Sequence, residues 1–131
     1  MKPLIWIEPA EVWVLHGRLV ALFGGPSGVR DSSLLESALA RPRQIESYGE
    51  GWDVAGLAAA YTAGIVKNHP FADGNKRTGF VVGILFLELN GYQFAALEEE
   101  AAQAVISLAE GSLDEAGYAE FLRAKSERTG S

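Results

Sequence analysis

One apolar segment, residues 78–89, constrains the fold more than any other part of this sequence. Within it, residues 80–87 read Phe-Val-Val-Gly-Ile-Leu-Phe-Leu, so a helix formed here would be apolar nearly all round. Such a helix has to be surrounded by other elements of the chain. Glu88 interrupts the run, which is also too short to cross a membrane. The segment therefore predicts a buried central helix, ended by Asn90-Gly91.

Three helices are predicted before this segment. Pro9 marks the start of the first, Asp31 or Ser32 caps the second, and Asp53 caps the third. Pro42 is predicted to stop the second, because proline cannot donate to the helix ladder. The polar residues 43–51 are then a loop. The glycine-rich residues 24–28 lack the Gly-Lys-Ser/Thr of a nucleotide P-loop and are interpreted as a plain connector.

After the central helix, residues 92–94 are predicted to be extended and residues 97–109 to form an amphipathic helix. Ser112 is predicted to cap a last short helix, and the polar tail of residues 125–131 to be frayed. The prediction is an all-α fold, a single compact bundle of about six helices in one domain over residues 1–131, with its core at about residues 4–123.

Composition excludes several classes of function. A formal net charge of −6 argues against nonspecific binding of nucleic acid or of an anionic membrane. There is no cysteine, which removes disulfides, thiol nucleophiles and cysteine-ligated zinc. The apolar stretch at the N-terminus is too short for a signal peptide. The expected location is the cytoplasm.

Residues 69–80, His-Pro-Phe-Ala-Asp-Gly-Asn-Lys-Arg-Thr-Gly-Phe, combine chemical groups that suit phosphate. Gly74 and Asn75 tolerate the positive φ of a tight anion-binding loop. Lys76 and Arg77 follow where the central helix begins, and two cations at a helix N-terminus oppose its macrodipole. A bound polyphosphate would turn that penalty into attraction. The segment predicts a phosphate-handling active site with Gly74, Asn75, Lys76 and Arg77 as its clamp.

Two other residues in this segment are candidates for chemistry. His69 suits a general base, because its ordinary pKa is near neutral; alone, it could also be a polar residue at a helix C-terminus. Asp73 is an oxygen ligand suited to Mg²⁺, or otherwise a turn former. Phe71 is interpreted as a structural anchor of the loop. His16 has no motif around it and is interpreted as an ordinary helix-face residue.

These residues resemble the Fic motif, His-x-Phe-x-(Asp/Glu)-(Gly/Ala)-Asn-(Gly/Lys)-Arg. Lys76, where most Fic enzymes have glycine, resembles the death-on-curing (Doc) branch of the Fic/Doc family, which contains toxins of toxin–antitoxin systems. Residues 24–39 also look Doc-like, with the pattern Gly-Gly-x-x-Gly-x-Arg-Asp-x-x-Leu-Leu-Glu-Ser-Ala-Leu. The resemblance runs from about Pro9 to about Phe121.

The resemblance implies a toxin that transfers the γ-phosphate of ATP, with Mg²⁺, to a protein hydroxyl. In the family the target is a threonine of elongation factor Tu, and translation stops. The same resemblance implies His69 as the base and Asp73 as the magnesium ligand. Transfer of AMP, the activity of Fic relatives, is the alternative enzyme function, and a catalytically idle Fic-fold binding module is a third possibility.

The resemblance also bears on regulation. Self-restrained Fic enzymes pair an inhibitory helix, Ser/Thr-x-x-x-Glu-Gly/Asn, with a second arginine three residues after the motif. Here Phe80 occupies that arginine's position, and neither Glu50-Gly51 nor Glu110-Gly111 has Ser or Thr four residues before the glutamate. Regulation by a separate, Phd-like antitoxin is therefore expected. By analogy, residues 43–51 correspond to a flap beside the active site.

Overall fold

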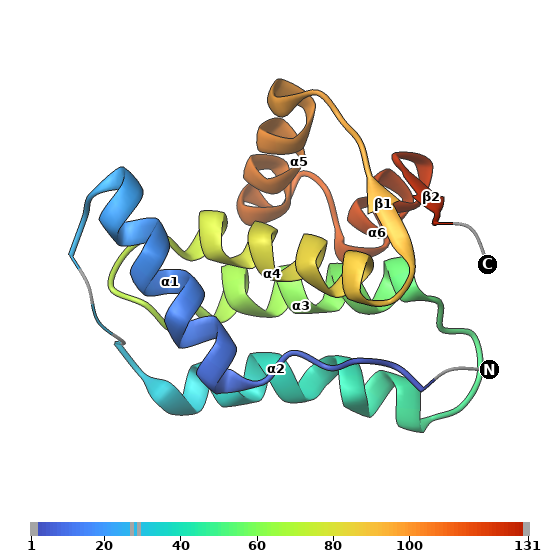
Figure 1. Cartoon of the computed structure of the whole chain (residues 1–131), viewed down its shortest axis with the longest axis horizontal. Helices are drawn as coiled ribbons and strands as arrows, with labels where there is room; N and C mark the ends of the chain where they lie inside the picture. The colour runs from blue at the N-terminus through green and yellow to red at the C-terminus, as the bar shows by residue number, and fades with distance from the viewer. Residues whose placement is uncertain (1–2, 27, 29, 130–131) are drawn as a thin grey trace.

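The computed structural model describes residues 3–26, 28 and 30–129. Within these residues the chain forms six helices and two short strands: α1 (Pro9–Phe23), α2 (Ser32–Ser47), α3 (Val54–Asn68), α4 (Asn75–Leu89), β1 (Tyr92–Phe94), α5 (Glu98–Glu110), α6 (Glu115–Ala124) and β2 (Ser126–Arg128). Figure 1 shows their arrangement. The predicted all-α bundle is confirmed. None of the described helices is long and apolar enough to cross a membrane.

Two antiparallel helices, α3 and α4, form the centre of the bundle (Figure 1). Glycines on α4 bring them close together: a Cβ at Gly83 would collide with the Thr62 hydroxyl, and one at Gly79 would lie 3.2 Å from the Thr62 carbonyl oxygen. The hydroxyl of Thr62 donates to the carbonyl of Gly79 at 2.8 Å. α3, rich in alanine, is buried continuously along residues 57–66, whereas α4 is only partly covered on one side. The centre is therefore a pair of helices.

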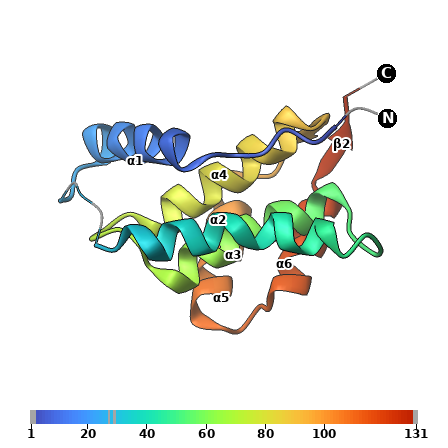
Figure 2. The same cartoon turned by 90° about the horizontal axis from the view of Figure 1, so that it is seen from below.

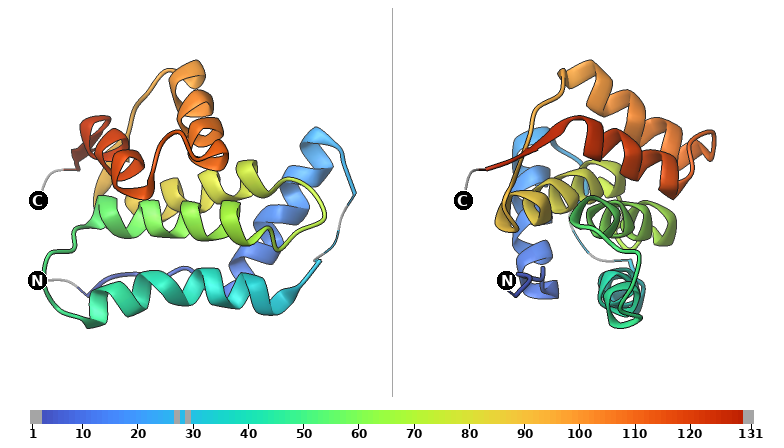
Figure 3. Two further views of the ribbon diagram at one scale, coloured as in Figure 1. Left: turned by 180° about the vertical axis from the view of Figure 1, so that it is seen from behind. Right: turned by 90° about the vertical axis from the view of Figure 1, so that its right-hand side faces the viewer.

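The remaining helices cover this pair from three sides. α2 runs along α3 on one side, and α5 and α6 lie on the opposite side (Figures 1 and 2). α1 crosses the beginning of α4, as the two further views in Figure 3 also show. This crossing places the end of α1 beside the turn that joins α3 to α4.

The prediction that Pro42 stops the second helix is wrong. α2 continues to Ser47, with Pro42 buried inside it, so residues 43–47 are helical and the predicted loop begins later. Pro42 cannot donate to the carbonyl of Ala38, four residues earlier. That carbonyl faces α3 at Gly64, where an added Cβ would lie only 3.2 Å from the Ala38 oxygen. Close packing against α3 accounts for the continuation of the helix.

The helix caps were predicted with mixed success. Asp31 and Asp53 cap α2 and α3 as expected, accepting from the N–H groups of Ser33 and Gly56. Ser112 does not cap the last helix; Asp114 does, accepting from the Gly117 N–H at 2.7 Å.

The prediction of a frayed tail is wrong for its middle residues. Ser126–Arg128 forms β2 and pairs in antiparallel register with Tyr92–Phe94. The guanidinium of Arg128 lies 5.6 Å from the ring centre of Tyr92, opposite it in the register. Residues 130 and 131 lie outside the described part of the chain.

Candidate active site

The motif forms the turn between the two central helices. His69 is the C-cap of α3 and has left-handed backbone angles, φ 56° and ψ 53°. Among the described residues it alone has a positive φ without being glycine. A conformation of this kind costs on the order of 1–3 kcal/mol and persists only where neighbouring groups hold it. Gly74, with φ 80°, is the N-cap of α4.

Arg30, just before α2, holds the backbone of His69. Its Nε donates to the carbonyl of His69 at 2.9 Å, and its Nη2 donates to the carbonyl of Asn68 at 3.3 Å. The N–H groups of Arg30 and Asp31 both donate to the carbonyl of Pro70, at 2.7 and 3.1 Å. A cation at a helix C-terminus is also favourable to the macrodipole. The sequence alone indicated no role for Arg30, although it is the arginine of the Doc-like pattern in residues 24–39.

The side chain of Asn75 is turned inward. Its Oδ1 accepts from the N–H of Phe71 at 3.0 Å, and its Nδ2 donates to the carbonyl of Phe71 at 3.0 Å. These two contacts fix the orientation of the carboxamide. Nδ2 also lies 3.1 Å from Nδ1 of His69, which must therefore accept. Asn75 thus orients the imidazole, and the neutral ring carries its proton on Nε2.

Phe71 is fully buried, as expected of a structural anchor. Its ring stacks on the imidazole of His16, with centroids 3.9 Å apart and an interplanar angle of 7°. The interpretation of His16 as an ordinary helix-face residue is wrong: it is 4% exposed, and its Nε2 lies 2.9 Å from the carbonyl oxygen of Asp73. No motif in the sequence surrounds His16, so only the crossing of α1 over α4 reveals this contact.

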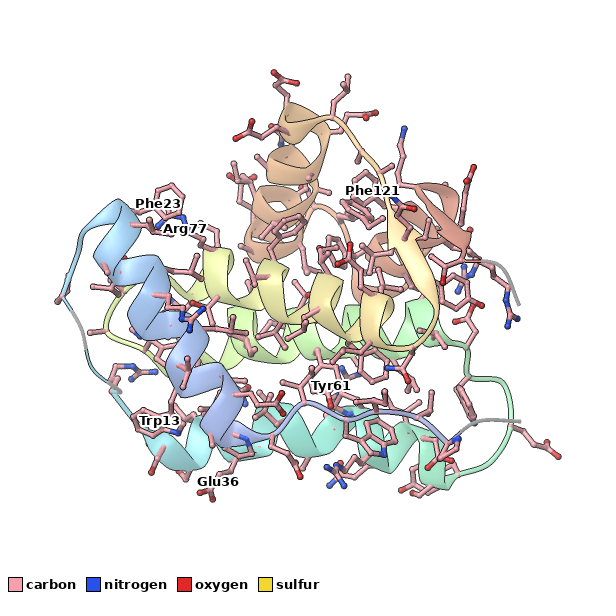
Figure 4. All side chains as sticks on the ribbon, in the orientation of Figure 1. Trp13, Phe23, Glu36, Tyr61, Arg77 and Phe121 are labelled. Carbon is pink, nitrogen blue, oxygen red and sulfur yellow. The ribbon has the colours of Figure 1, made fainter. Side chains whose placement is uncertain are left out.

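A cleft of about 350 Å³ opens at this turn, lined by Phe23, Gly24, Gly25, His69, Asp73, Gly74, Asn75, Lys76 and Arg77. The glycine loop is therefore one wall of the site and more than a connector. A Cβ at Gly25, where φ is 105°, would lie 2.6 Å from Oδ2 of Asp73, so the carboxylate needs glycine there. The guanidinium carbon of Arg77 lies 4.2 Å from the ring centre of Phe23. Figure 4 shows the two side chains next to each other.

The floor of the cleft suits an anion. The first backbone hydrogen bond of α4 runs from the Thr78 N–H to the Gly74 carbonyl, at 2.9 Å. The N–H groups of the three residues before Thr78, which are Asn75, Lys76 and Arg77, have no carbonyl of the same helix to bind and point out of its N-terminus. Among the described residues, no side chain caps this end. The helix dipole and the two cationic side chains add positive potential at the same place.

A magnesium ion fits this site only together with phosphate. In the described part of the chain no three His, Asp or Glu side chains cluster as a complete metal cage. Asp73 supplies one carboxylate at the edge of the anion-binding turn. Mg²⁺ commonly takes one or two carboxylates, with phosphate oxygens and water completing its octahedron. The donor set matches a metal that arrives with a polyphosphate.

The fold and the cleft define a helical domain whose central turn brings an imidazole, a carboxylate and the N-terminus of a helix together. The Fic/DOC family model matches residues 6–87, which include this turn and both walls of the cleft. The chain belongs to the Fic/DOC family.

Two relatives are similar to this chain. "Protein kinase doc" of Escherichia phage P1 is 31% identical over 117 residues, covering 89% of this chain and 92% of the phage protein. "Toxin Doc" of Mycolicibacterium smegmatis is 42% identical over 78 residues, covering 56% of this chain and 58% of that protein's length.

Proposed function

We propose that the chain is a Doc-type toxin that transfers the γ-phosphate of ATP to a hydroxyl of a protein. The observation that carries this proposal is the meeting of His69, Asp73 and the free end of α4 around one cleft. The name of the phage relative, a protein kinase, supports the same reaction. Such a transfer depends mainly on positioning and charge stabilisation, so a small site with few catalytic groups suffices.

The proposed phosphate contacts come from the beginning of α4. Backbone N–H groups at Gly74 and Asn75 would bind phosphate oxygens, and the side chains of Lys76 and Arg77 would neutralise their charge. The guanidinium of Arg77 would bind phosphate either from its position over the ring of Phe23 or after moving away from that ring. Asp73 would hold Mg²⁺, which supplies charge neutralisation between adjacent phosphates.

His69 is proposed to take the proton of the attacking hydroxyl at Nε2. The hydroxyl oxygen then bonds to the γ-phosphorus, the bond from that phosphorus to the bridging oxygen breaks, and ADP leaves. Because Nδ1 accepts from Asn75, the resting neutral ring holds its proton on Nε2. Base catalysis therefore requires that proton to move to Nδ1, and the Asn75 contact to loosen, when the substrates bind.

Transfer of AMP is the second candidate, and Lys76 argues against it. In AMP-transferring relatives glycine at this position lets the backbone approach the phosphates and exposes the α-phosphorus. A lysine side chain occupies that space and adds an ammonium group. The nucleotide would then bind in reverse, with its γ-phosphorus near His69. Gly74 matches the AMP-transferring motif, which is why the alternative deserves a direct test.

Labelled ATP separates the two reactions. A protein target incubated with the chain and ATP labelled at the α or γ phosphorus should receive label only from the γ position. Lys76→Gly should lose part of that transfer, since it removes one phosphate contact. Label from the α position, reaching the target with the unaltered chain, would establish AMP transfer instead.

The proposed target is a threonine of elongation factor Tu, and the proposed regulator is a separate Phd-like antitoxin. Both rest on the family resemblance, and the name of one relative, a toxin, agrees with regulation by a cognate antitoxin. Expression of this chain alone should slow bacterial growth, and a His69→Ala chain should not. Normal growth with abundant folded protein would argue against toxicity.

A further inference from the structure

His16 contacts the proposed phosphate-binding turn, residues 73–77, at Asp73 and lies beside the next residue, Gly74. Its Nε2 lies 2.9 Å from the carbonyl oxygen of Asp73. A Cβ built at Gly74 would lie 3.7 and 3.8 Å from Nε2 and Cδ2 of the same ring. The ring is held in place on its face by Phe71, stacked at 3.9 Å. This imidazole therefore has little freedom to turn away.

The direction of this hydrogen bond is fixed by chemistry. A carbonyl oxygen can only accept, so Nε2 of His16 must carry a proton and donate. The carbonyl of Asp73 shares its peptide plane with the N–H of Gly74, and the described backbone contains no cis peptide bond. In a trans peptide the C=O and N–H point in opposite directions. Holding the carbonyl on His16 thus aims the Gly74 N–H away from α1.

We propose that His16 is a positioning residue for the phosphate-binding turn: by holding the Asp73 carbonyl, it fixes the peptide that presents the Gly74 N–H to the anion. Gly74 lines the cleft, and its αL conformation begins α4 directly. A donor in place before the ligand arrives lowers the cost of ordering the turn on binding. This inference extends the proposed function, because the anion in question is the nucleotide's phosphate.

Three variants separate the hydrogen bond from mere packing. His16→Phe keeps a ring that can stack on Phe71 but loses the donor, whereas His16→Gln loses the stack but keeps an N–H the same number of bonds from the backbone. Val12→Ala, at a fully buried residue of the same helix, is a control for lost stability. The measurements are calorimetric binding of Mg²⁺·ATP, thermal melting, and the Gly74 amide signal in ¹H–¹⁵N spectra without ligand.

The expected result is a loss of affinity of about five- to tenfold in His16→Phe, the effect of one hydrogen bond, with a shifted Gly74 signal. His16→Gln should bind within about twofold of the unaltered chain. Val12→Ala should melt earlier with affinity and Gly74 signal unchanged. If His16→Phe binds as tightly as the unaltered chain and the Gly74 signal stays in place, the proposal is wrong.

Two further outcomes of the experiment also bear on the proposal. If His16→Phe does not fold, the ¹⁵N spectrum of the unaltered chain decides, because His16 must be protonated at Nε2; a bare Nε2 would overturn the proposal. If the unaltered chain binds no nucleotide, the proposed function fails, while the Gly74 signals of the ligand-free variants still support or refute the role of His16.

Discussion

Two clefts of similar size lie at opposite ends of α3, and their charges are arranged differently. The cleft of about 290 Å³ near the start of α3 includes Asp53, Glu115, Glu120 and Arg123. There, Arg123 pairs with Asp53 at 2.7 Å and with Glu120 at 2.5 Å, and Glu115 pairs with Arg41. In the cleft at the motif, by contrast, neither Asp73 nor Lys76 nor Arg77 forms an ion pair with any described residue.

Asp53 and Asp73, each near the start of a helix, differ in the same way: the first is paired within the chain and the second is not. Asp53 caps α3 by accepting from the Gly56 N–H at 2.8 Å, so the end of that helix is satisfied within the chain. Asp73 precedes α4, whose described neighbours provide no side-chain cap. Its carboxylate lies instead against the glycine loop. Charges that are paired within the chain have no donors left for a ligand, whereas N–H groups and cations that converge without a partner in the chain are available to bind an anion. This contrast supports our proposal that the motif cleft is the functional one.

The largest effect is expected from His69. His69→Ala should lower target phosphorylation by about 10²- to 10⁴-fold, because a general base is lost. His69→Gln, which can donate a hydrogen bond but cannot take a proton, should fall equally far. Arg123→Gln in the other cleft should leave the rate unchanged. Near-normal turnover of His69→Gln would show that the ring acts by donating from Nε2.

The same substitution at the two aspartates should give opposite results. Asp73→Asn keeps the shape of the side chain but loses the charge, so binding of Mg²⁺ and of nucleotide should weaken together, with little change in melting temperature. Asp53→Asn should lower the melting temperature slightly and leave binding intact. Titration calorimetry with and without Mg²⁺ measures both. Equal nucleotide affinity for Asp73→Asn and the unaltered chain would remove Asp73 from the metal site.

A smaller effect is expected where Arg30 holds the backbone of His69. Arg30→Gln should lower kcat by about tenfold while KM changes little, because a charged hydrogen bond of about 1.5 kcal/mol that orients the proposed base is lost. Arg18, exposed on α1, provides a matched control in Arg18→Gln. If Arg30→Gln and Arg18→Gln lower kcat and the melting temperature to the same extent as each other, Arg30 contributes only to the stability of the fold.

Around the motif cleft, the sequence predicted the local features of the structure and missed those that depend on contacts between helices. Apolar periodicity and capping residues predicted the helices, because both are local. The sequence did not show that α2 continues through Pro42, because the close packing of Ala38 on α2 depends on Gly64 of another helix. The inward direction of Asn75 and the contact of His16 depend in the same way on which helices cross. Spacing within the motif predicted which residues meet, but not which of them support the others.

The smallest effect is expected on the pH dependence of stability, through Asp53 in the cleft near the start of α3. The hydrogen bond from Arg123, followed by that from the Gly56 N–H, holds the pKa of Asp53 below its ordinary value, despite some burial. A carboxyl whose folded pKa is depressed contributes stability above its unfolded pKa, about 3.9, and loses it as the pH falls through the folded value. The difference in melting temperature between the unaltered chain and Asp53→Asn should thus be constant from pH 7 to about pH 5 and shrink below pH 4.

Because the ion pair between Asp53 and Arg123 is half-exposed, its contribution to stability should stay below about 1 kcal/mol. A difference that grows on acidification would show that Asp53 is not stabilised as a charged group, and the contrast between the two clefts would lose its electrostatic basis.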